Sequence, residues 1–183
     1  MSAAVAIGVA PVVSARSSAI FTFAQARIAG RALEAWLTSD EALGLPLDAV
    51  ERGTEERGRE VLRLMLQAHL QARGTGDVGP AIEVMPAPLA PDAPAPAPVV
   101  HNHRRLHKCE VETILGSVAA NRTAYGCRGG ESVHPLDESA QLPERSFSYE
   151  LQRRIALGAV KEPFDEALES VEQATGVPVP KRS

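Results

Sequence analysis

The C-terminal stretch, residues 148–183, constrains the fold most, because proline and glycine divide it into segments of known geometry. Ser148 is a favourable helix N-cap. Apolar residues follow it at helical spacing: Leu151, Ile155, Ala159 and Val160. Pro163 must end this helix, because proline donates no backbone hydrogen bond and displaces the residue before it from the helical conformation. We therefore expect one helix between Ser148 and Pro163.

A second helix is predicted directly after this proline. Its apolar stripe is formed by Phe164, Ala167, Leu168, Val171 and Ala174. Gly176 suits the left-handed residue that commonly ends a helix, residues 177–179 must be extended, and Pro180 suits the first position of a third helix. This succession is the layout of a helix-turn-helix, whose second motif helix enters the major groove of DNA. Because the sequence ends three residues later, we expect an incomplete motif over residues 148–183.

Helical periodicity also dominates residues 19–79. One predicted helix face is formed by Phe21, Ala24, Ile28, Ala32, Ala35 and Trp36. After a break at 44–46, the longest helical candidate covers residues 47–73. Gly53 and Gly58 each weaken a helix interior by about 1 kcal/mol relative to alanine, so we expect the firm part of this helix after them. Two consecutive amphipathic helices predict a helical hairpin, and residues 47–73 are the surface through which the chain could form a homo-oligomer.

Two stretches show neither a helical nor a strand pattern. Residues 1–18 are small and aperiodic, and we interpret them as a flexible leader, since no Lys or Arg precedes their apolar run as in a secretory signal. Residues 80–100 contain an alternating Ala-Pro run, which favours extended polyproline II and disfavours helix or sheet pairing. We therefore predict a semi-rigid linker over 80–100; a proline-rich ligand is the alternative, without the charged flanks typical of such ligands.

Residues 101–108, HNHRRLHK, form the one distinctly basic island of the chain, without any acid. Its cations could contact nucleic-acid phosphates, or the segment could be a disordered polar entry to a loop. A metal site is a further alternative, because imidazole is a good ligand for zinc or nickel. Its ligands would be His101, His103 and His107. Closed structural sites normally draw paired ligands from two separated turns, so we expect no metal here.

Partial alternation predicts a short β-hairpin over residues 110–125, with a turn at 115–117. The hairpin belongs to a largely irregular region, 101–147. Two cysteines, Cys109 and Cys127, bracket it and could face each other, but neither belongs to a C-x-x-C pair. The expected fold class is mainly α with a small β-hairpin region (α+β).

The overall charge excludes one way of binding nucleic acid. The 183 residues carry a formal net charge of -4 and the sequence pI is about 5.8, so no basic field covers the whole protein. Any DNA contact must come from local patches. No apolar run reaches the length of about 18 residues that a transmembrane helix needs, and we expect a cytoplasmic protein.

From Cys109 onward, four blocks in order resemble the N-terminal half of DDE-type insertion-sequence transposases of the ISKra kind. The blocks are ETILGSV with Arg122 and Tyr125, then SVHPLD, then LPERSFSYEL, and finally FDEALESVEQATGVPVPKR. The segments LEAWL, residues 33–37, and RGREVLRLMLQAHL, residues 57–70, fit the leading helices of that family less specifically.

The resemblance implies a DNA-transposing enzyme with a metal-dependent core of three carboxylates, which lies beyond the helix-turn-helix in such proteins. Strand transfer needs a carboxylate cluster that holds a divalent metal. The acids available here are Asp137, Asp165, Glu166 and Glu169. Glu166, Glu169 and Glu172 share the polar side of one predicted helix, which a solvated face explains. We therefore expect no catalytic residues, no cofactor, and a transposase truncated before its catalytic core.

The function expected from these patterns is that of a DNA-binding and association region without a nuclease. The predicted contacts, all to phosphate, are Arg104, Arg105, Lys108, Arg153, Arg154, Lys161, Lys181 and Arg182. Each could equally be an ordinary surface charge. Binding through phosphates alone should be weak and steeply salt-sensitive. The alternatives are a protein–protein module that dimerises through residues 47–73 without a DNA role, and an inert remnant of a broken element.

Overall fold

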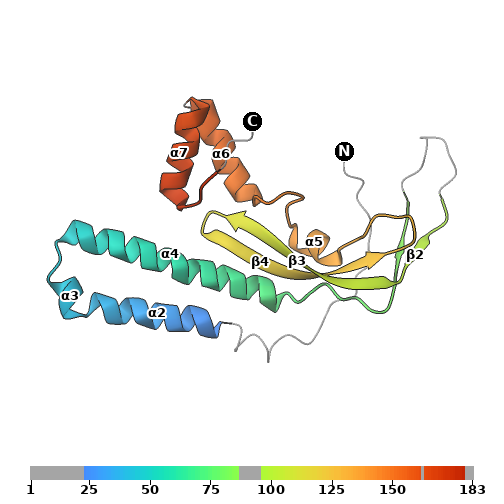
Figure 1. Ribbon diagram of the computed structural model, residues 1–183, viewed down its shortest axis with the longest axis horizontal. Helices are drawn as coiled ribbons and strands as arrows, with labels where there is room; N and C mark the ends of the chain where they lie inside the picture. Colours follow the sequence, from blue (N-terminus) through green and yellow to red (C-terminus); the bar gives the residue numbers. More distant parts are fainter. Residues whose placement is uncertain (1–22, 87–95, 162, 180–183) are drawn as a thin grey trace. The chain divides into compact units, whose positions relative to one another are not determined.

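The fold is mainly helical, as the sequence predicts. The computed structural model describes residues 23–86, 96–161 and 163–179 (Figure 1). Its helices are α2 (Ala24–Leu37), α3 (Asp40–Leu43), α4 (Leu47–Ala72), α5 (Pro135–Ala140), α6 (Tyr149–Lys161) and α7 (Phe164–Thr175). Its strands are β1 (Ile82–Val84), β2 (Val99–His101), β3 (His103–Thr113) and β4 (Gly116–Gly126). They form two antiparallel two-stranded sheets, β1–β2 and β3–β4, which confirms the α+β expectation.

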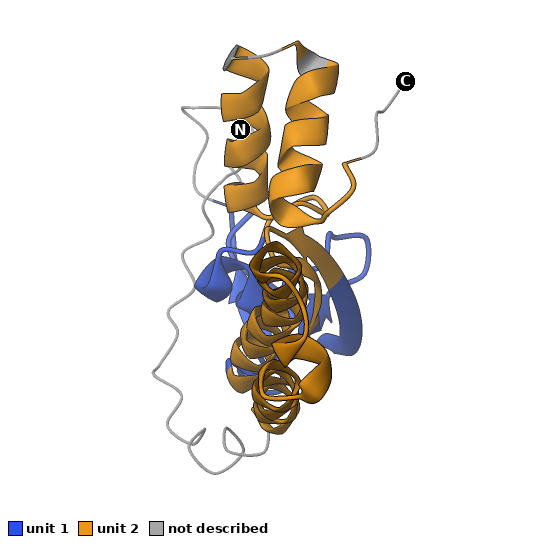
Figure 2. Ribbon diagram, turned by 90° about the vertical axis from the view of Figure 1, so that its left-hand side faces the viewer, with its two compact units in different colours: residues 1–14, 73–109, 121–142 blue, residues 15–72, 110–120, 143–183 orange. Residues whose placement is uncertain are grey.

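The described chain divides into two compact units (Figure 2). Unit 1 takes residues 73–109 and 121–142, and unit 2 takes residues up to 72, residues 110–120 and those from 143 onward. The β3–β4 hairpin therefore contributes its base to unit 1 and its tip to unit 2. The contiguous regions expected from the sequence stay a prediction, and the leader, residues 1–18, lies outside the described residues.

In unit 2, α2 and α4 pack against each other as the predicted helical hairpin (Figure 1). The predicted break at 44–46 is confirmed, since α3 ends at Leu43 and α4 begins at Leu47. The longer helix is continuous through both of its early glycines, so its ordered part is longer than we expected from propensity. Tertiary packing stabilises an amphipathic helix more than intrinsic propensity does, and it decides the outcome here.

Gly53 shows how this packing uses a glycine. A Cβ at this position would overlap the ring of Trp36 on α2, so the ring can lie directly on the backbone of α4. The guanidinium of Arg57, one turn further along α4, stands 4.0 Å above the centre of the same ring. Gly53 lowers the helix propensity of α4, but its missing side chain leaves the space that the ring of the one tryptophan of the chain occupies.

The packed face of α2 differs from the predicted one. Ala26 is buried and Leu33 is half-buried, whereas Ile28 is 67 % exposed. Ala32 and Ala35, also expected inside, are exposed as well. Because the alanines of this helix are spread over an arc of about 200° around its axis, its apolar pattern does not single out one face. Phe21, which opened the predicted face, lies outside the described residues.

The C-terminal helices follow the predicted boundaries. The Ser148 hydroxyl accepts a hydrogen bond from the backbone N–H of Leu151 at 3.2 Å, which caps α6. Pro163 separates α6 from α7, and Gly176, at φ 67°, ends α7 in the left-handed conformation. The two helices pack against each other (Figure 2). The third helix that the sequence predicts from Pro180, and that a helix-turn-helix needs, falls on residues that the structure does not describe.

A small core connects these helices with the tip of the hairpin inside unit 2. Its buried members are Leu151, Val171 and Val177, and its half-buried neighbours are Ile114, Phe147, Ile155 and Val179. The predicted apolar stripes are partly wrong, since Ala159, Val160 and Ala174 are exposed. Thr175 is buried in their place, because its hydroxyl donates to the carbonyl of Val171 at 2.6 Å and is therefore satisfied.

Unit 1 contains a sheet that the sequence did not predict. β1 and β2 pair antiparallel at the two ends of the expected linker, with Ile82 opposite His101 and Val84 opposite Val99. Most of the Ala-Pro run between them, at residues 87–95, lies outside the described residues. Short strands that flank a proline-rich run can therefore pair even though the run itself disfavours pairing.

Tyr125 on β4 is the centre of unit 1 and is fully buried. Its hydroxyl lies 2.9 Å from both Asp77 Oδ1 and the Gly79 carbonyl, and it accepts a hydrogen bond from the Val78 backbone N–H at 2.9 Å. Burial raises the pKa of Tyr125. This fully satisfied hydroxyl ties residues 77–79 to the base of the hairpin.

The β3–β4 hairpin is longer than predicted. Its strands are joined by residues 114–115, and Gly116 then takes φ 116°, a conformation that favours glycine. Within the described residues, no helix is both long and apolar enough to cross a membrane.

Candidate nucleic-acid interface

Residues 103–108 of the basic island form the first half of β3 and His101 ends β2, so the alternative of a disordered loop entry is wrong. All six side chains from His103 to Lys108 are exposed. Residues 103–108 lack the β-branched residues typical of strands, but β4 contributes Thr123 and Tyr125, which favour pleated structure. Pairing with β4 therefore extends the hairpin through a segment that would not form a strand alone.

The strand geometry distributes the cations over two faces. Successive side chains of a strand point to opposite faces. Arg104 and Lys108 therefore share one face, and Arg105 lies on the other together with His103 and His107. No acidic side chain interrupts this exposed half of the strand.

Arg104 is anchored within unit 1. Its Nη1 donates to Asp77 Oδ1 at 3.3 Å and to the Gly79 carbonyl at 3.1 Å. The pKa of Asp77 lies below its usual range, because the Gly79 backbone N–H and then the Tyr125 hydroxyl donate to its carboxylate, with a smaller effect from the charge of Arg104. Asp77 therefore stays ionised and fixes the position of the Arg104 guanidinium.

Arg105 has a weaker partner. Its Nε donates to His103 Nδ1 at 3.3 Å, on the same face of the strand. A guanidinium binds a charged phosphate more strongly than a neutral imidazole, because charge-assisted hydrogen bonds are about twice as strong as neutral ones. Arg105 is therefore the residue of β3 whose described contact a phosphate would most readily replace.

On α6, both predicted arginines bind one carboxylate. Glu150 accepts hydrogen bonds from Arg153 at 2.7 and 2.8 Å and from Arg154 at 3.3 Å. The hydrogen bond from Arg153, followed by that from Arg154, lowers the pKa of Glu150 to about 2. Such exposed ion pairs contribute little to stability, so a phosphate can compete for either arginine.

Three predicted contacts cannot be placed. The side chain of Lys161, at the end of α6, and the whole of Lys181 and Arg182 lie outside the described residues. The structure therefore describes contacts on β3, in unit 1, and on α6, in unit 2.

The histidines of the basic island do not form a metal centre. His101 is buried, and its Nδ1 lies 3.2 Å from the Tyr125 carbonyl. Cys109 and Cys127 are both free thiols. In the described part of the chain, no group of three or more His, Cys, Asp or Glu side chains is arranged to hold a metal ion.

The structure also brings together a half-buried polar cluster in unit 1. Arg122 Nη1 donates to Asp137 Oδ2, and His134 Nδ1 lies 3.9 Å from the same oxygen. The rings of His134 and His107 are 5.7 Å apart. Among the described residues, Arg122 Nε, His134 Nε2 and Asp137 Oδ1 are buried without a hydrogen-bond partner.

This cluster depresses the pKa of His134. Burial is the main cause, the charge of Arg122 adds to it, and Asp137 acts in the opposite direction. From the sequence, Arg122 and His134 entered only the family resemblance, and Asp137 was also considered as an available acid. The sequence does show His134 three residues before Asp137, at the start of a helix whose first residue is a proline. Nothing in the sequence placed Arg122 beside these two residues.

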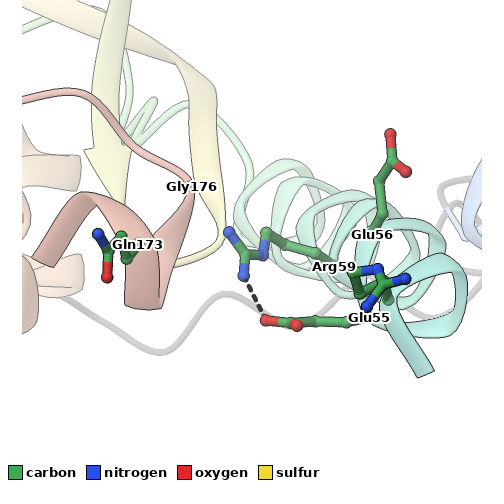
Figure 3. Close-up of a pocket in the computed structure, with 6 residues that line it drawn as sticks. Glu55, Glu56, Arg59, Gln173 and Gly176 are labelled. Carbon is green, nitrogen blue, oxygen red and sulfur yellow. Dashed lines mark hydrogen bonds and ion pairs between the residues drawn. The ribbon is translucent and has the colours of Figure 1, made fainter. Parts of the chain in front are cut away.

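Unit 2 contains a polar cavity of about 390 Å³ between α4 and the end of α7 (Figure 3). It is lined by Arg52, Glu55, Glu56, Arg59, Gln173 and Gly176. The guanidinium of Arg59 pairs with Glu55 at 2.8 Å, and that of Arg52 pairs with Asp48 at 2.9 Å. Two arginines and two glutamates line the cavity, so the formal charges of its lining cancel and favour no ion of either sign.

Comparison with known proteins assigns no relative: no family model, no curated protein and no solved structure matches the chain.

Proposed function

We propose that the chain is the DNA-binding and self-associating region of a DNA-transposition protein, and that it contacts the phosphate backbone through β3 and α6. The observation that carries this proposal is the exposed, acid-free strand from His103 to Lys108. The transposition context is supported by the four sequence blocks that resemble DDE-type transposases. The helix pair α6–α7, which ends at Gly176, supports the helix-turn-helix interpretation.

The charge distribution favours phosphate contact over base reading. The net charge is -4, so attraction to DNA must be local. Arginine and lysine side chains on a strand and on a helix surface can neutralise phosphates and release counterions without reading sequence. We therefore propose weak binding without strong sequence preference.

A catalytic role is not part of the proposal. Glu166, Glu169 and Glu172 on α7 are all exposed, as a solvated helix face requires. Carboxylates that hold a catalytic metal instead converge on one point within a shaped site.

The proposal is tested by neutralising two cations of β3. We expect the double variant Arg105→Gln, Lys108→Gln to bind a duplex about tenfold more weakly at low salt, the equivalent of about 1.4 kcal/mol. The slope of log K against log salt should become shallower by about 1.8, or 0.9 for each lost phosphate contact. Fluorescence anisotropy with a labelled duplex measures both quantities.

A matched control separates the strand from overall charge. The double variant Arg31→Gln, Arg145→Gln removes the same charge from exposed positions outside β3 and α6, and it should change the affinity little. Equal weakening by both double variants would show that only net charge matters, and a wild-type chain that does not bind DNA would reject the proposal.

A further inference from the structure

α4 uses two of its sides inside unit 2 and leaves a third side open. Trp36 of α2 covers the side at Gly53. The hairpin tip covers the neighbouring side, about 40° away around the helix axis, where the Gln67 amide donates to the Ala119 carbonyl at 2.6 Å and accepts from the Ala119 N–H at 2.7 Å. On the third side, Leu62 is 50 % exposed and Met65 is 44 % exposed.

The residues of this third side form one stripe, which we call the α4 stripe. Its members are Leu47, Glu51, Gly58, Leu62, Met65 and His69. At 3.6 residues per turn they fall within an arc of about 60° around the helix. The structure leaves Leu47, Glu51 and His69 exposed as well. The stripe is therefore apolar at Leu62 and Met65, with the polar residues Glu51 and His69 on either side of this apolar part.

Gly58 distinguishes this stripe from an ordinary solvent-facing surface. Among the described residues, a Cβ at Gly58 would meet no atom within 4 Å, in contrast to Gly53, where the Trp36 ring occupies the space. A glycine in a helix interior lowers helix stability, and packing against the described part of the chain does not explain this one. It leaves a notch in the open stripe, one turn before Leu62.

We propose that a second copy of this chain docks on the α4 stripe, with the two α4 helices antiparallel. A two-fold axis perpendicular to the helices at the level of Glu60 places Leu62 of each copy over the Gly58 notch of the other. Both residues are two positions along the helix from that level. The same axis places Glu51 of each copy opposite His69 of the other, since both are nine positions away.

Charge selects this arrangement. The stripe carries an acid near its N-terminal end and a histidine near its C-terminal end. Antiparallel pairing brings these unlike groups together, and the imidazole can donate to the carboxylate. Parallel pairing would place Glu51 against Glu51, which is repulsive. The stripe has six residues on each copy, fewer than the about 20–30 residues a side of a standard interface, so the dimer is weak.

This inference names the surface for the self-association half of the proposed function and is independent of DNA binding. Sedimentation velocity over a concentration series measures the association constant of the full chain. We expect Leu62→Gln and Gly58→Ala each to lower this constant at least about tenfold. Circular dichroism should show that Gly58→Ala keeps or raises the melting temperature, because its methyl group meets no atom of the residues that the structure describes.

Leu43→Gln is the matched control, since Leu43 is 73 % exposed on α3, outside the α4 stripe. It should leave the association constant unchanged. A similar loss in Leu43→Gln and Leu62→Gln would overturn the proposal, because it would indicate unspecific apolar association.

Charge reversal tests the antiparallel register. Glu51→Lys and His69→Glu should each weaken the dimer. The double variant should restore it, because the introduced lysine of one copy then faces the introduced glutamate of the other. Failure of the double variant to restore association would overturn the register. A wild-type chain that binds DNA but stays monomeric would overturn this inference alone, whereas a dimer that ignores DNA would reject only the DNA proposal.

Discussion

Above the pH range in which carboxylates titrate, the titration of His134 should change the free energy of unfolding most clearly. Its folded-state pKa is lowered by burial and by Arg122, with His107 adding to this effect and Asp137 opposing it. The folded chain therefore binds fewer protons than the unfolded chain below the ordinary histidine pKa of about 6.5. The stabilisation is complete above that value and is lost as pH falls through the folded pKa.

Chemical denaturation as a function of pH measures this effect. Between about pH 7 and about pH 5.5, we expect the free energy of unfolding to fall, by no more than about 1.4 kcal/mol per pH unit for one proton. His134→Gln should remove this part of the slope, and His103→Gln, which changes an exposed histidine, should keep it. An unchanged slope in His134→Gln would contradict our description of the cluster.

Single residues were predictable from the sequence where their effect is local. Ser148 as a cap, Pro163 as a break and Gly176 as a helix end follow from backbone chemistry, and all three are confirmed. The burial of Ala26 in place of Ile28 was not predictable, because it depends on where α2 meets α4. The neighbours of His134 were not predictable for the same reason, because only tertiary packing brings Arg122 of β4 close to Asp137 of α5.

Among the elements, α6 gives the most specific prediction about DNA binding. Glu150 forms ion pairs with both Arg153 and Arg154, so its carboxylate competes with a DNA phosphate for these two arginines. Glu150→Gln should weaken these contacts and raise the affinity for a duplex. The salt slope should become steeper by up to about 1.8, or 0.9 for each arginine that gains a phosphate.

Anisotropy titrations at several salt concentrations measure this gain, and Glu34→Gln serves as the control. Glu34 is an exposed acid on α2, so its loss changes the net charge equally without releasing an arginine of α6. If both variants gain the same affinity, α6 does not contact DNA.

Elements differ in how far their sequence determines them. α4, α6 and α7 have strong periodicity and clear end signals, and their limits agree closely with prediction. The first half of β3 has neither, because its strand state depends on pairing with β4. The β1–β2 sheet was missed because its three-residue strands are too short for a periodic signal.

For the whole molecule, charge is the property that connects fold and proposed function. An acidic chain can bind DNA only through patches, and the structure describes two predicted ones, in β3 and α6. Five of the eight predicted contacts lie there with described side chains: Arg104, Arg105, Lys108, Arg153 and Arg154. Binding should therefore depend steeply on salt and weakly on DNA sequence.

The salt dependence of duplex binding by the intact chain tests this claim most directly. If the contacts of β3 and α6 are made to phosphate, the slope of log K against log salt should lie between about -1.8, for two contacts, and about -4.5, for all five. A flat salt dependence, or no binding even at low salt, would contradict phosphate contact through these two patches.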